Sequence, residues 1–429
     1  MSTRIITQTD TLRGELTVPA DKSVSHRSIM LGALASGTSV VRNFLRAEDP
    51  ISTMNAFRML GIDIRDSGSE VIIKGKGIRG LAEPANIIDC GNSGTTMRLL
   101  AGVLAGQPFF SVMTGDDSLR QRPMARVIDP LRAMGADISA RCSGKYAPIA
   151  IRGTALKPTD FALPIASAQV KSCILLAGLG IDGTVTVTEP EKTRDHSERM
   201  LSAMGADIAV DGLRVSLKGG RELQPFELTV PSDFSSAAFF IAAALIAPNA
   251  SVTIRGVGVN PTRTGMLDIL ASMGASVVLE NARTVSGEPV ADIVCTTAPG
   301  LRAVTLGKRE VARAIDEFPI LCILASQAEG TTVIRGAKEL RVKESDRIAA
   351  MAEGLKRMGA QVEEFEDGIA VTGKAALTGT EIESRHDHRI AMAFAVAGLI
   401  ADGETAIRHA SCADISFPGF YELLGGLTR

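Results

Sequence analysis

The stretch LRAMGADI (131–138) decides the fold, because close copies of it return along the whole chain. The other copies are LSAMGADI (201–208), FRMLGIDI (57–64), LASMGASV (270–277), LKRMGAQV (355–362) and the shorter YELLGG (421–426). Their glycines are Gly61, Gly135, Gly205, Gly274, Gly359 and Gly425, so the steps are 74, 70, 69, 85 and 66 residues. Five nearly equal steps indicate one supersecondary unit of about seventy residues that fills the chain in six repeats.

Each repeat contains two kinds of helical segment. The first kind is apolar nearly all round and should be buried; these segments are 25–35, 94–105, 168–179, 234–246, 317–328 and 388–400. A short β-branched run follows each of them, and then an amphipathic helix that stops at Met-Gly or Leu-Gly, where a left-handed glycine is expected. Another strand comes next. The pattern predicts an α/β fold of six βαβαβ-type repeats, with sheets covering buried helices.

Composition excludes several classes of protein. The chain has 429 residues, 45% of them hydrophobic, which is enough for more than one core. A net charge of −2 without a long basic tract argues against nucleic acid as a partner. The apolar segments are too short to span a membrane, and the N-terminal sequence is not a signal peptide. The six cysteines lack paired spacing, so we expect reduced thiols and a cytoplasmic protein.

The sixth repeat lacks its last strands, and the N-terminal segments RIITQT and GELTVPA could supply them. We therefore expect two lobes, one formed by residues 20–228 and the other by residues 1–19 plus 229–429. The chain would cross between the lobes near Pro19 and near Pro231. Two crossings make a hinge, and the cleft between the lobes is the expected active site.

Charged residues gather where the buried helices begin. Helix N-termini attract anions through free N–H groups and the helix dipole. The charged and polar residues at these positions and at the starts of the outer helices include Lys22, Arg27, Arg98, Arg122, Lys171, Arg194, Asp316, Lys343, Glu344, Arg347 and Arg389. Cations beside carboxylates suit a site that holds phosphates or carboxylates next to an acid/base pair.

Each of these residues also has an ordinary structural interpretation. Ser23 could be a helix cap, and a turn with Gly91 and Gly94 is more often structural than phosphate-binding. Single exposed cations are usually only solvated. His26, His196 and His388 lack metal-ligand spacing, so no metal site is expected. The functional interpretation is favoured because the unusual residues return at the same point of successive repeats.

Eight motifs make the chain resemble the 5-enolpyruvylshikimate-3-phosphate synthase family from end to end. They are DKSVSHR (21–27), GNSGTTMR (91–98), RPMARVIDPLR (122–132), SAQVKS (167–172), RDHSERML (194–201), DEFPIL (316–321), LRVKESDRI (340–348) and DHRIAM (387–392). SAQVKS and RDHSERM resemble the class II branch. The resemblance implies a two-lobed inside-out α/β barrel and an enzyme of the shikimate pathway, which serves aromatic amino-acid biosynthesis.

The resemblance also implies the residues that hold each substrate. Shikimate-3-phosphate would be held by Lys22, Ser23, Arg27, Ser167, Ala168, Gln169, Arg194, Asp316 and Lys343. Phosphoenolpyruvate would be held by Lys22, Gly94, Arg122, Gln169, Arg347 and Arg389. Arginine forks suit this ligand because bidentate pairing fixes the orientation of a carboxylate or phosphate.

The implied chemistry is an addition followed by an elimination through a tetrahedral intermediate. Glu344 would deliver a proton to the methylene carbon of phosphoenolpyruvate, while Asp316 and Lys22 would share the removal of the 5-hydroxyl proton. We expect no cofactor, no metal, no nucleic-acid partner and no membrane association, and a monomeric state. Gly94 is not the alanine that accompanies tolerance of glyphosate in this family, so we expect sensitivity to that inhibitor.

Some features leave other functions open. Class I members have a lysine two residues before the Phe-Pro pair near the C-terminus, where this chain has Ile415. The nearest alternative is the sister enzyme that uses UDP-N-acetylglucosamine, but it has Lys-Asn in place of Lys22-Ser23 and a cysteine-bearing loop absent here. RNA 3′-phosphate cyclases share a related repeat, but the chain lacks a basic face. A non-catalytic anion-binding protein would not need Asp316 and Glu344.

Overall fold

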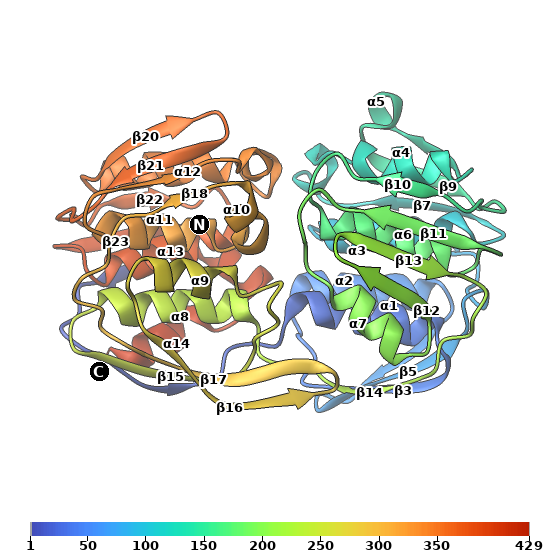
Figure 1. Ribbon diagram of the computed structural model, residues 1–429, viewed down its shortest axis with the longest axis horizontal. Coiled ribbons are helices and arrows are strands. Elements are labelled where there is room, and N and C mark those ends of the chain that lie inside the picture. Colours follow the sequence, from blue (N-terminus) through green and yellow to red (C-terminus); the bar gives the residue numbers. More distant parts are fainter. Residues whose placement is uncertain (1, 429) are drawn as a thin grey trace. The chain divides into compact units, whose positions relative to one another are not determined.

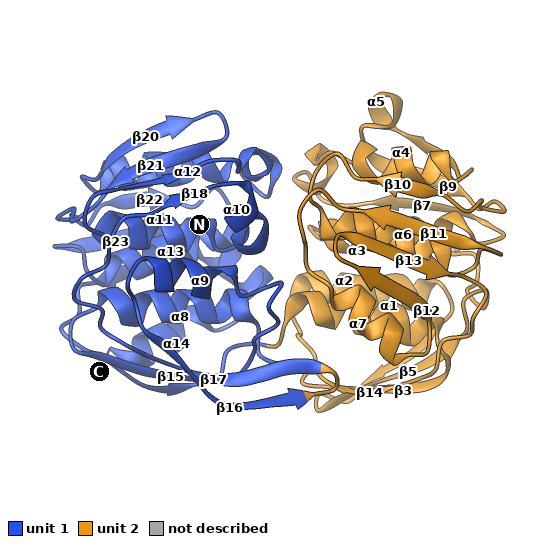
Figure 2. Ribbon diagram, viewed as in Figure 1, with its two compact units in different colours: residues 1–19, 231–284, 288–429 blue, residues 20–230, 285–287 orange. Residues whose placement is uncertain are grey.

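The computed structural model describes residues 2–428 and divides into two compact units, each with its own hydrophobic core (Figure 2). Unit 2 consists of Ala20–Val230 and the hairpin turn Val285–Gly287. Unit 1 holds the described residues up to Pro19, residues 231–284 and those from Glu288 onward. Repeats 1–3 therefore lie in unit 2 and repeats 4–6 in unit 1.

Unit 2 combines buried inner helices with outer helices and sheets (Figure 1). Its helices are α1 (Lys22–Leu34), α2 (Glu48–Met59), α3 (Gly94–Ala105), η1 (Leu119–Gln121), α4 (Ala125–Ala133), α5 (Arg141–Gly144), α6 (Ala168–Gly178) and α7 (His196–Ala203). Its strands are β3 (Ser36–Arg42), β4 (Asp63–Asp66), β5 (Glu70–Lys76), β6 (Ile88–Asp89), β7 (Phe110–Thr114), β8 (Asp137–Ala140), β9 (Tyr146–Arg152), β10 (Asp160–Ala162), β11 (Thr184–Thr188), β12 (Asp207–Asp211), β13 (Arg214–Lys218) and β14 (Glu227–Thr229). The strands form the sheets β14-β3-β5-β4, β6-β7-β9-β8 and β10-β11-β13-β12.

Unit 1 repeats the same plan. Its helices are α8 (Phe234–Ile246), α9 (Gly265–Ser272), α10 (Lys308–Ala314), α11 (Phe318–Gln327), η2 (Lys338–Val342), α12 (Arg347–Arg357), α13 (His388–Gly398), η3 (Ala410–Ile415) and α14 (Phe420–Leu427). Its strands are β1 (Thr3–Thr7), β2 (Leu12–Leu16), β15 (Ala250–Gly258), β16 (Val277–Val285), β17 (Glu288–Thr296), β18 (Thr305–Leu306), β19 (Thr331–Ile334), β20 (Gln361–Phe365), β21 (Gly368–Thr372), β22 (Glu381–Glu383) and β23 (Glu404–Arg408). Its sheets are β1-β23-β22, β16-β17-β15-β2 and β18-β19-β21-β20.

The predicted α/β architecture, with sheets around buried helices, is confirmed. Every residue of α13 is buried, and α8 is buried from Phe234 to Leu245. In Figure 1 the helices α1, α3 and α6 run through the interior of unit 2, and α8, α11 and α13 through that of unit 1. Five repeats have one more strand than predicted, because the strand after the outer helix turns back as a hairpin; β8 and β9 are an example. The sheet of the sixth repeat has three strands.

The N-terminal strands close two different sheets of unit 1. β1 pairs antiparallel with β23, with Thr3 opposite Arg408, and so completes the sheet of the sixth repeat as predicted. β2 pairs parallel with β15, with Leu16 opposite Ile254, and so belongs to the sheet of the fourth repeat. The expectation that both segments complete the sixth repeat is therefore correct only for the first.

The repeated glycines end their helices as expected in all but the last repeat. Gly61, Gly135, Gly205, Gly274 and Gly359 have φ angles of 82°, 97°, 85°, 84° and 93°, the left-handed conformation in which a Cβ is unfavourable. Gly425 lies inside α14, so the prediction of a helix stop there is wrong. The five stops are what turn each outer helix back into its hairpin.

Other global features concern thiols, metals and membranes. All six cysteines are free; five are buried and Cys142 is exposed. Across residues 2–428 no three His, Cys, Asp or Glu side chains gather in a way that could hold a metal ion. Within the same span, no helix has both the length and the apolar character needed to cross a membrane.

Candidate functional site

The predicted site residues fall into two groups, one in each unit. The group in unit 2 contains Lys22, Ser23, Arg27, Gly94, Arg122, Ser167, Ala168, Gln169 and Arg194. The group in unit 1 contains Asp316, Lys343, Glu344, Arg347 and Arg389. Most of the residues in both groups lie at or near helix N-termini, where unpaired backbone N–H groups favour anions.

In unit 2 the inner helices begin at capped turns. Asp21 accepts a hydrogen bond from Val24 N over 2.8 Å, Ser93 accepts from Thr96 N over 3.1 Å, and Ser167 accepts from Val170 N over 3.4 Å. Ser23 lies in the first turn of α1 after the cap, so its hydroxyl is not the capping group. This result leaves Ser23 available for another role.

Lys22 begins α1 next to a carboxylate that the sequence did not suggest. Its Nζ donates to Asp49 Oδ2 over 3.1 Å, and the two side chains are 18% and 10% exposed. Asp49 lies in the first turn of α2, where the helix dipole also stabilises a negative charge. Lys22 is thus partly exposed and paired with Asp49.

Arg27 joins α1 to two other helices. Its Nε donates to Ser197 Oγ over 2.7 Å, and its Nη2 donates to Ser172 Oγ over 3.0 Å. The two serine hydroxyls lie 2.7 Å apart. Because Ser172 belongs to α6 and Ser197 to α7, this buried guanidinium connects the first repeat with the third.

The N-terminus of α3 has two arginines beside a glycine. A Cβ on Gly94 would lie 3.2 Å from Nη1 of Arg98 and 3.5 Å from Nη1 of Arg122. Arg122 Nη2 donates to Asn92 Oδ1 over 2.6 Å. Arg98 Nη1 donates to Gln169 Oε1 over 2.6 Å, so α3 and the start of α6 are joined at this point.

The segment before α7 carries Arg194. It follows Thr193, whose hydroxyl donates to the buried carboxylate of Glu189. Lys171 of α6 lies against this segment and is fully buried, 2.8 Å from Glu189 Oε2 and 2.6 Å from Glu198 Oε1. We expected Lys171 to be one of the cations that bind a substrate anion. Instead it forms ion pairs with these two glutamates.

In unit 1, Arg347 is the centre of the predicted group. Its side chain is 1% exposed; Nε lies 2.8 Å from Asp387 Oδ2, Nη2 lies 2.7 Å from Glu344 Oε2, and Nη1 lies 3.6 Å from Asp316 Oδ1. Although burial lowers the pKa of Arg347, these carboxylates raise it, so the net shift is upward. Within residues 2–428, Nη1 makes no hydrogen bond, although it is buried. A buried donor of this kind can serve an incoming anion.

Asp316 links the two arginines of this group. Its backbone carbonyl accepts a hydrogen bond from Arg389 Nη1 over 2.8 Å, and its Oδ2 lies 3.8 Å from Arg389 Nη2. The Asp316 side chain is 15% exposed and that of Glu344 is 20% exposed, so both carboxylates can reach a ligand. Burial lowers the pKa of Lys343, and nearby carboxylates only partly oppose this effect.

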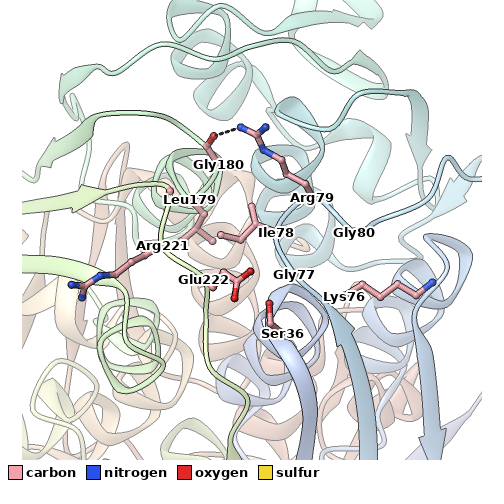
Figure 3. Close-up of a pocket in the computed structure, with 11 residues that line it drawn as sticks. Ser36, Lys76, Gly77, Ile78, Arg79, Gly80, Leu179, Gly180, Arg221 and Glu222 are labelled. Carbon is pink, nitrogen blue, oxygen red and sulfur yellow. Dashed lines mark hydrogen bonds between the residues drawn. The ribbon is translucent and has the colours of Figure 1, made fainter.

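Unit 2 also contains a pocket that is separate from the predicted site residues (Figure 3). Its volume is about 470 Å³, and it is lined by Ser36, Lys76, Gly77, Ile78, Arg79, Gly80, Leu179, Gly180, Gly220, Arg221 and Glu222. The pocket adjoins the C-terminal end of α1, about 20 Å along the helix from Lys22. In Figure 3 the side chains of Lys76 and Arg221 extend in opposite directions. The pocket shares no residue with the predicted site.

Comparison with known proteins gives agreement along the whole chain. The family model described as EPSP synthase (3-phosphoshikimate 1-carboxyvinyltransferase) matches residues 6–424. A 3-phosphoshikimate 1-carboxyvinyltransferase from Thermodesulfovibrio yellowstonii is 52% identical over 99% of this chain and 100% of its own. One from Geotalea daltonii is 55% identical over 97% of each chain.

Solved structures agree with these relatives. The EPSP synthase from Acinetobacter baumannii has a TM-score of 0.87 and 50% identity, covering 99% of this chain and 98% of its own. The enolpyruvyl transferase NikO from Streptomyces tendae has a TM-score of 0.79 at 18% identity, covering 99% and 96%. At 18% identity, the similarity to NikO shows a shared fold and nothing more.

Proposed function

This chain belongs to the EPSP synthase family, and from that premise we propose that it is a 3-phosphoshikimate 1-carboxyvinyltransferase of the shikimate pathway. It would transfer the enolpyruvyl group of phosphoenolpyruvate to the 5-hydroxyl of shikimate-3-phosphate and release inorganic phosphate. The observation that carries the proposal is 52% identity to a relative of that name over 99% of this chain. The alternative acceptor, UDP-N-acetylglucosamine, is not favoured by these relatives.

In this proposal the group in unit 2 supplies most of the shikimate-3-phosphate contacts. They would be made by Lys22, Ser23, Arg27, Ser167, Ala168, Gln169 and Arg194, with Asp316 and Lys343 added from unit 1. The helix N-termini and the guanidinium of Arg27 suit a phosphate, since charge-assisted hydrogen bonds to oxyanions are the stronger kind.

Phosphoenolpyruvate would be held mainly by arginines. Arg122, Arg347 and Arg389 would take its carboxylate and phosphate, with Lys22, Gly94 and Gln169 beside them. The buried Nη1 of Arg347 supports this role, because it lacks a hydrogen-bond acceptor among residues 2–428 and an anion oxygen would supply one. The small size of Gly94 supports it too, since a side chain there would press on Arg98 and contact Arg122.

Because these contacts come from both units, the proposal requires the two units to close around the substrates. The active site would be the cleft between a lobe of residues 20–228 and a lobe of residues 1–19 plus 229–429. Closure would exclude water and strengthen every ionic contact in the site.

The proposed reaction consists of two balanced steps. In the addition, Glu344 gives a proton to the methylene carbon of phosphoenolpyruvate, and the 5-hydroxyl oxygen bonds to the neighbouring carbon while Asp316 and Lys22 accept its proton. In the elimination, the new methyl group returns a proton to Glu344 and the bond between the ketal carbon and the phosphate oxygen breaks. Phosphate leaves with the proton that Asp316 and Lys22 took from the 5-hydroxyl. General acid–base groups of this kind contribute about 10²–10⁴-fold to a rate.

We also propose that the enzyme is a monomer of the cytoplasm that needs no cofactor. The six free cysteines support a reducing compartment, because thiols stay unpaired there. Sedimentation of the purified chain at micromolar concentration should give a mass near 45.0 kDa, whereas a dimer would contradict the monomer.

Phosphate release with each acceptor tests the proposal. Purified protein with phosphoenolpyruvate should release phosphate when shikimate-3-phosphate is added and give no release with UDP-N-acetylglucosamine. The reverse preference would overturn the proposal in favour of the sister activity. Release with neither acceptor would favour a non-catalytic anion-binding protein.

The role of Glu344 needs its own measurement. Glu344→Gln should abolish exchange of solvent deuterium into the methylene group of phosphoenolpyruvate and lower kcat by about 10²-fold or more. Glu353→Gln is a matched control, because Glu353 pairs with Arg385 at the surface and its side chain is 50% exposed. Wild-type exchange in the Glu344 variant would show that another group carries this proton.

A further inference from the structure

Unit 2 contains a buried ionic cluster on the segments that carry Gln169 and Arg194, two of the residues proposed to hold shikimate-3-phosphate. The cluster consists of Lys171, Glu189 and Glu198, whose side chains are 0%, 0% and 3% exposed. The Lys171 Nζ lies 2.8 Å from Glu189 Oε2 and 2.6 Å from Glu198 Oε1. One ammonium group with three N–H donors can bind two carboxylates at once, which no apolar side chain could do.

The cluster connects α6 with both ends of segment 189–198. Glu189 follows β11 at the start of the segment, and Glu198 lies in the first turn of α7 at its end. Thr193, in the middle, donates its hydroxyl proton to Glu189. Arg194 comes next in the chain. The position of Arg194 therefore depends on contacts that meet at a single amine.

A second set of contacts runs alongside the first. Ser172 follows Lys171 on α6, Ser197 precedes Glu198 on α7, and their hydroxyls lie 2.7 Å apart. Arg27 donates to both hydroxyls, over 2.7 Å to Ser197 and 3.0 Å to Ser172. Any shift of α7 relative to α6 would therefore displace the guanidinium of Arg27 as well.

Energetics favour a positioning role over a purely stabilising one. Removing three charged groups from water is costly, and buried ion pairs are often no more stabilising than apolar residues of similar volume. What such a cluster supplies is a defined geometry, because moving either carboxylate away from Lys171 leaves a buried charge without its partner.

We propose that Lys171, with Glu189 and Glu198, is a positioning group that fixes Arg194 and the Arg27–Ser197 contact for shikimate-3-phosphate. This inference rests on the proposed function. The cluster acts on the affinity for this substrate and leaves the chemical step and the affinity for phosphoenolpyruvate unchanged.

Calorimetric binding of shikimate-3-phosphate to the full chain tests the inference, with Lys171→Met as the first variant. This variant should bind shikimate-3-phosphate at least about tenfold more weakly, while the KM for phosphoenolpyruvate and kcat at saturation change less than about twofold. Lys171→Arg keeps the positive charge and can still donate hydrogen bonds to both carboxylates. It should therefore recover most of the affinity for shikimate-3-phosphate. Arg46→Met, which removes a partly exposed ion pair with Asp66 in the same unit, should bind as the wild type does.

The variant K171M/E189Q/E198Q covers the case in which Lys171→Met fails to fold. Because this variant leaves no charge buried in the cluster, it should fold. Because it also lacks the ion pairs that fix the geometry, it should still bind shikimate-3-phosphate weakly. Wild-type affinity in either folded variant would overturn the positioning role. Failure of the wild-type chain itself to bind shikimate-3-phosphate would instead overturn the proposed function.

Discussion

Arg347 and Asp387 form an ion pair in the interior of unit 1, with Nε 2.8 Å from Oδ2 and the two side chains 1% and 0% exposed. Asp387 also accepts hydrogen bonds from Ser345 Oγ over 3.0 Å and from Arg389 N over 2.9 Å. This one carboxylate therefore caps α13 and fixes the first residue of α12. Both proposed phosphoenolpyruvate arginines of unit 1 depend on it.

Replacing Asp387 by Asn should weaken binding of phosphoenolpyruvate and reduce stability. Asparagine can still cap α13, but it leaves the buried Arg347 with less negative charge, so we expect a loss of about 1–3 kcal/mol in the free energy of unfolding. The KM for phosphoenolpyruvate should rise at least severalfold. Denaturant unfolding and steady-state kinetics measure the two effects.

Asp346→Asn is the control for this prediction. Asp346 caps α12 and pairs with Arg341 over 2.7 Å, but the side chains are 32% and 23% exposed. Removing such a partly exposed charge should cost less than about 1 kcal/mol and leave the KM for phosphoenolpyruvate unchanged. Equal effects from the two variants would mean that burial of the Arg347 pair is irrelevant.

A methyl group at Gly94 should reduce the affinity for phosphoenolpyruvate and for glyphosate. The new Cβ would lie 3.2 Å from Arg98 Nη1, so this guanidinium must shift slightly, and 3.5 Å from Arg122 Nη1. We expect a several-fold higher KM for phosphoenolpyruvate in Gly94→Ala and a much larger rise in the glyphosate inhibition constant. The wild-type chain should be inhibited competitively with phosphoenolpyruvate, and an absence of competition at about millimolar glyphosate would contradict this.

The close approach of α12 and α13 at Gly354 should be sensitive to any added volume. A Cβ there would overlap the ring of Phe394, which is fully buried. Gly354→Ala should therefore reduce the free energy of unfolding by about 1–3 kcal/mol, and Phe394→Leu in the same chain should recover part of it. Gly425→Ala is the control, because nothing lies within 4 Å of that Cβ. Additive losses in the double variant would contradict this account.

His26 should make stability depend on pH below neutrality. Burial, together with the positive charges of Lys22 and Arg27, lowers the pKa of this imidazole well below 6.5. Below pH 6.5 the unfolded chain therefore binds a proton that the folded chain does not, and the free energy of unfolding falls as pH falls.

Comparison with His26→Leu isolates this effect. Relative to the variant, the wild type should lose up to about 1.4 kcal/mol per pH unit below pH 6.5. Above about pH 7.5 the two curves of unfolding free energy against pH should run parallel. Parallel curves down to pH 5 would show that His26 titrates alike in the folded and unfolded chains.

The repeats and the helix starts could be predicted because their signals are local. A Met-Gly helix stop and an apolar helix are each visible within about a dozen residues. The strand β2 shows where this reasoning fails. Its sequence fits either a sixth-repeat or a fourth-repeat sheet, and only pairing with β15, more than two hundred residues away, decides between them.

The charged residues show the same limit. Lys171 and Arg27 both lie near the start of a buried helix, and the sequence alone gives no reason to assign them different roles. Their difference comes from the partners that the fold brings to them, two carboxylates for Lys171 and two hydroxyls for Arg27. Nothing near Glu189 or Asp49 in the sequence indicates that either will face a lysine.

The pairing of β1 with β23 means that the order of synthesis and the order of folding differ. Unit 2 is almost one continuous stretch, so it can fold on the ribosome soon after residue 230 has emerged. The strand made first must wait for Arg408, its partner. At typical elongation rates of about 5–20 residues per second that delay is roughly twenty to eighty seconds, during which β1 lacks its strand partner and could be bound by a chaperone.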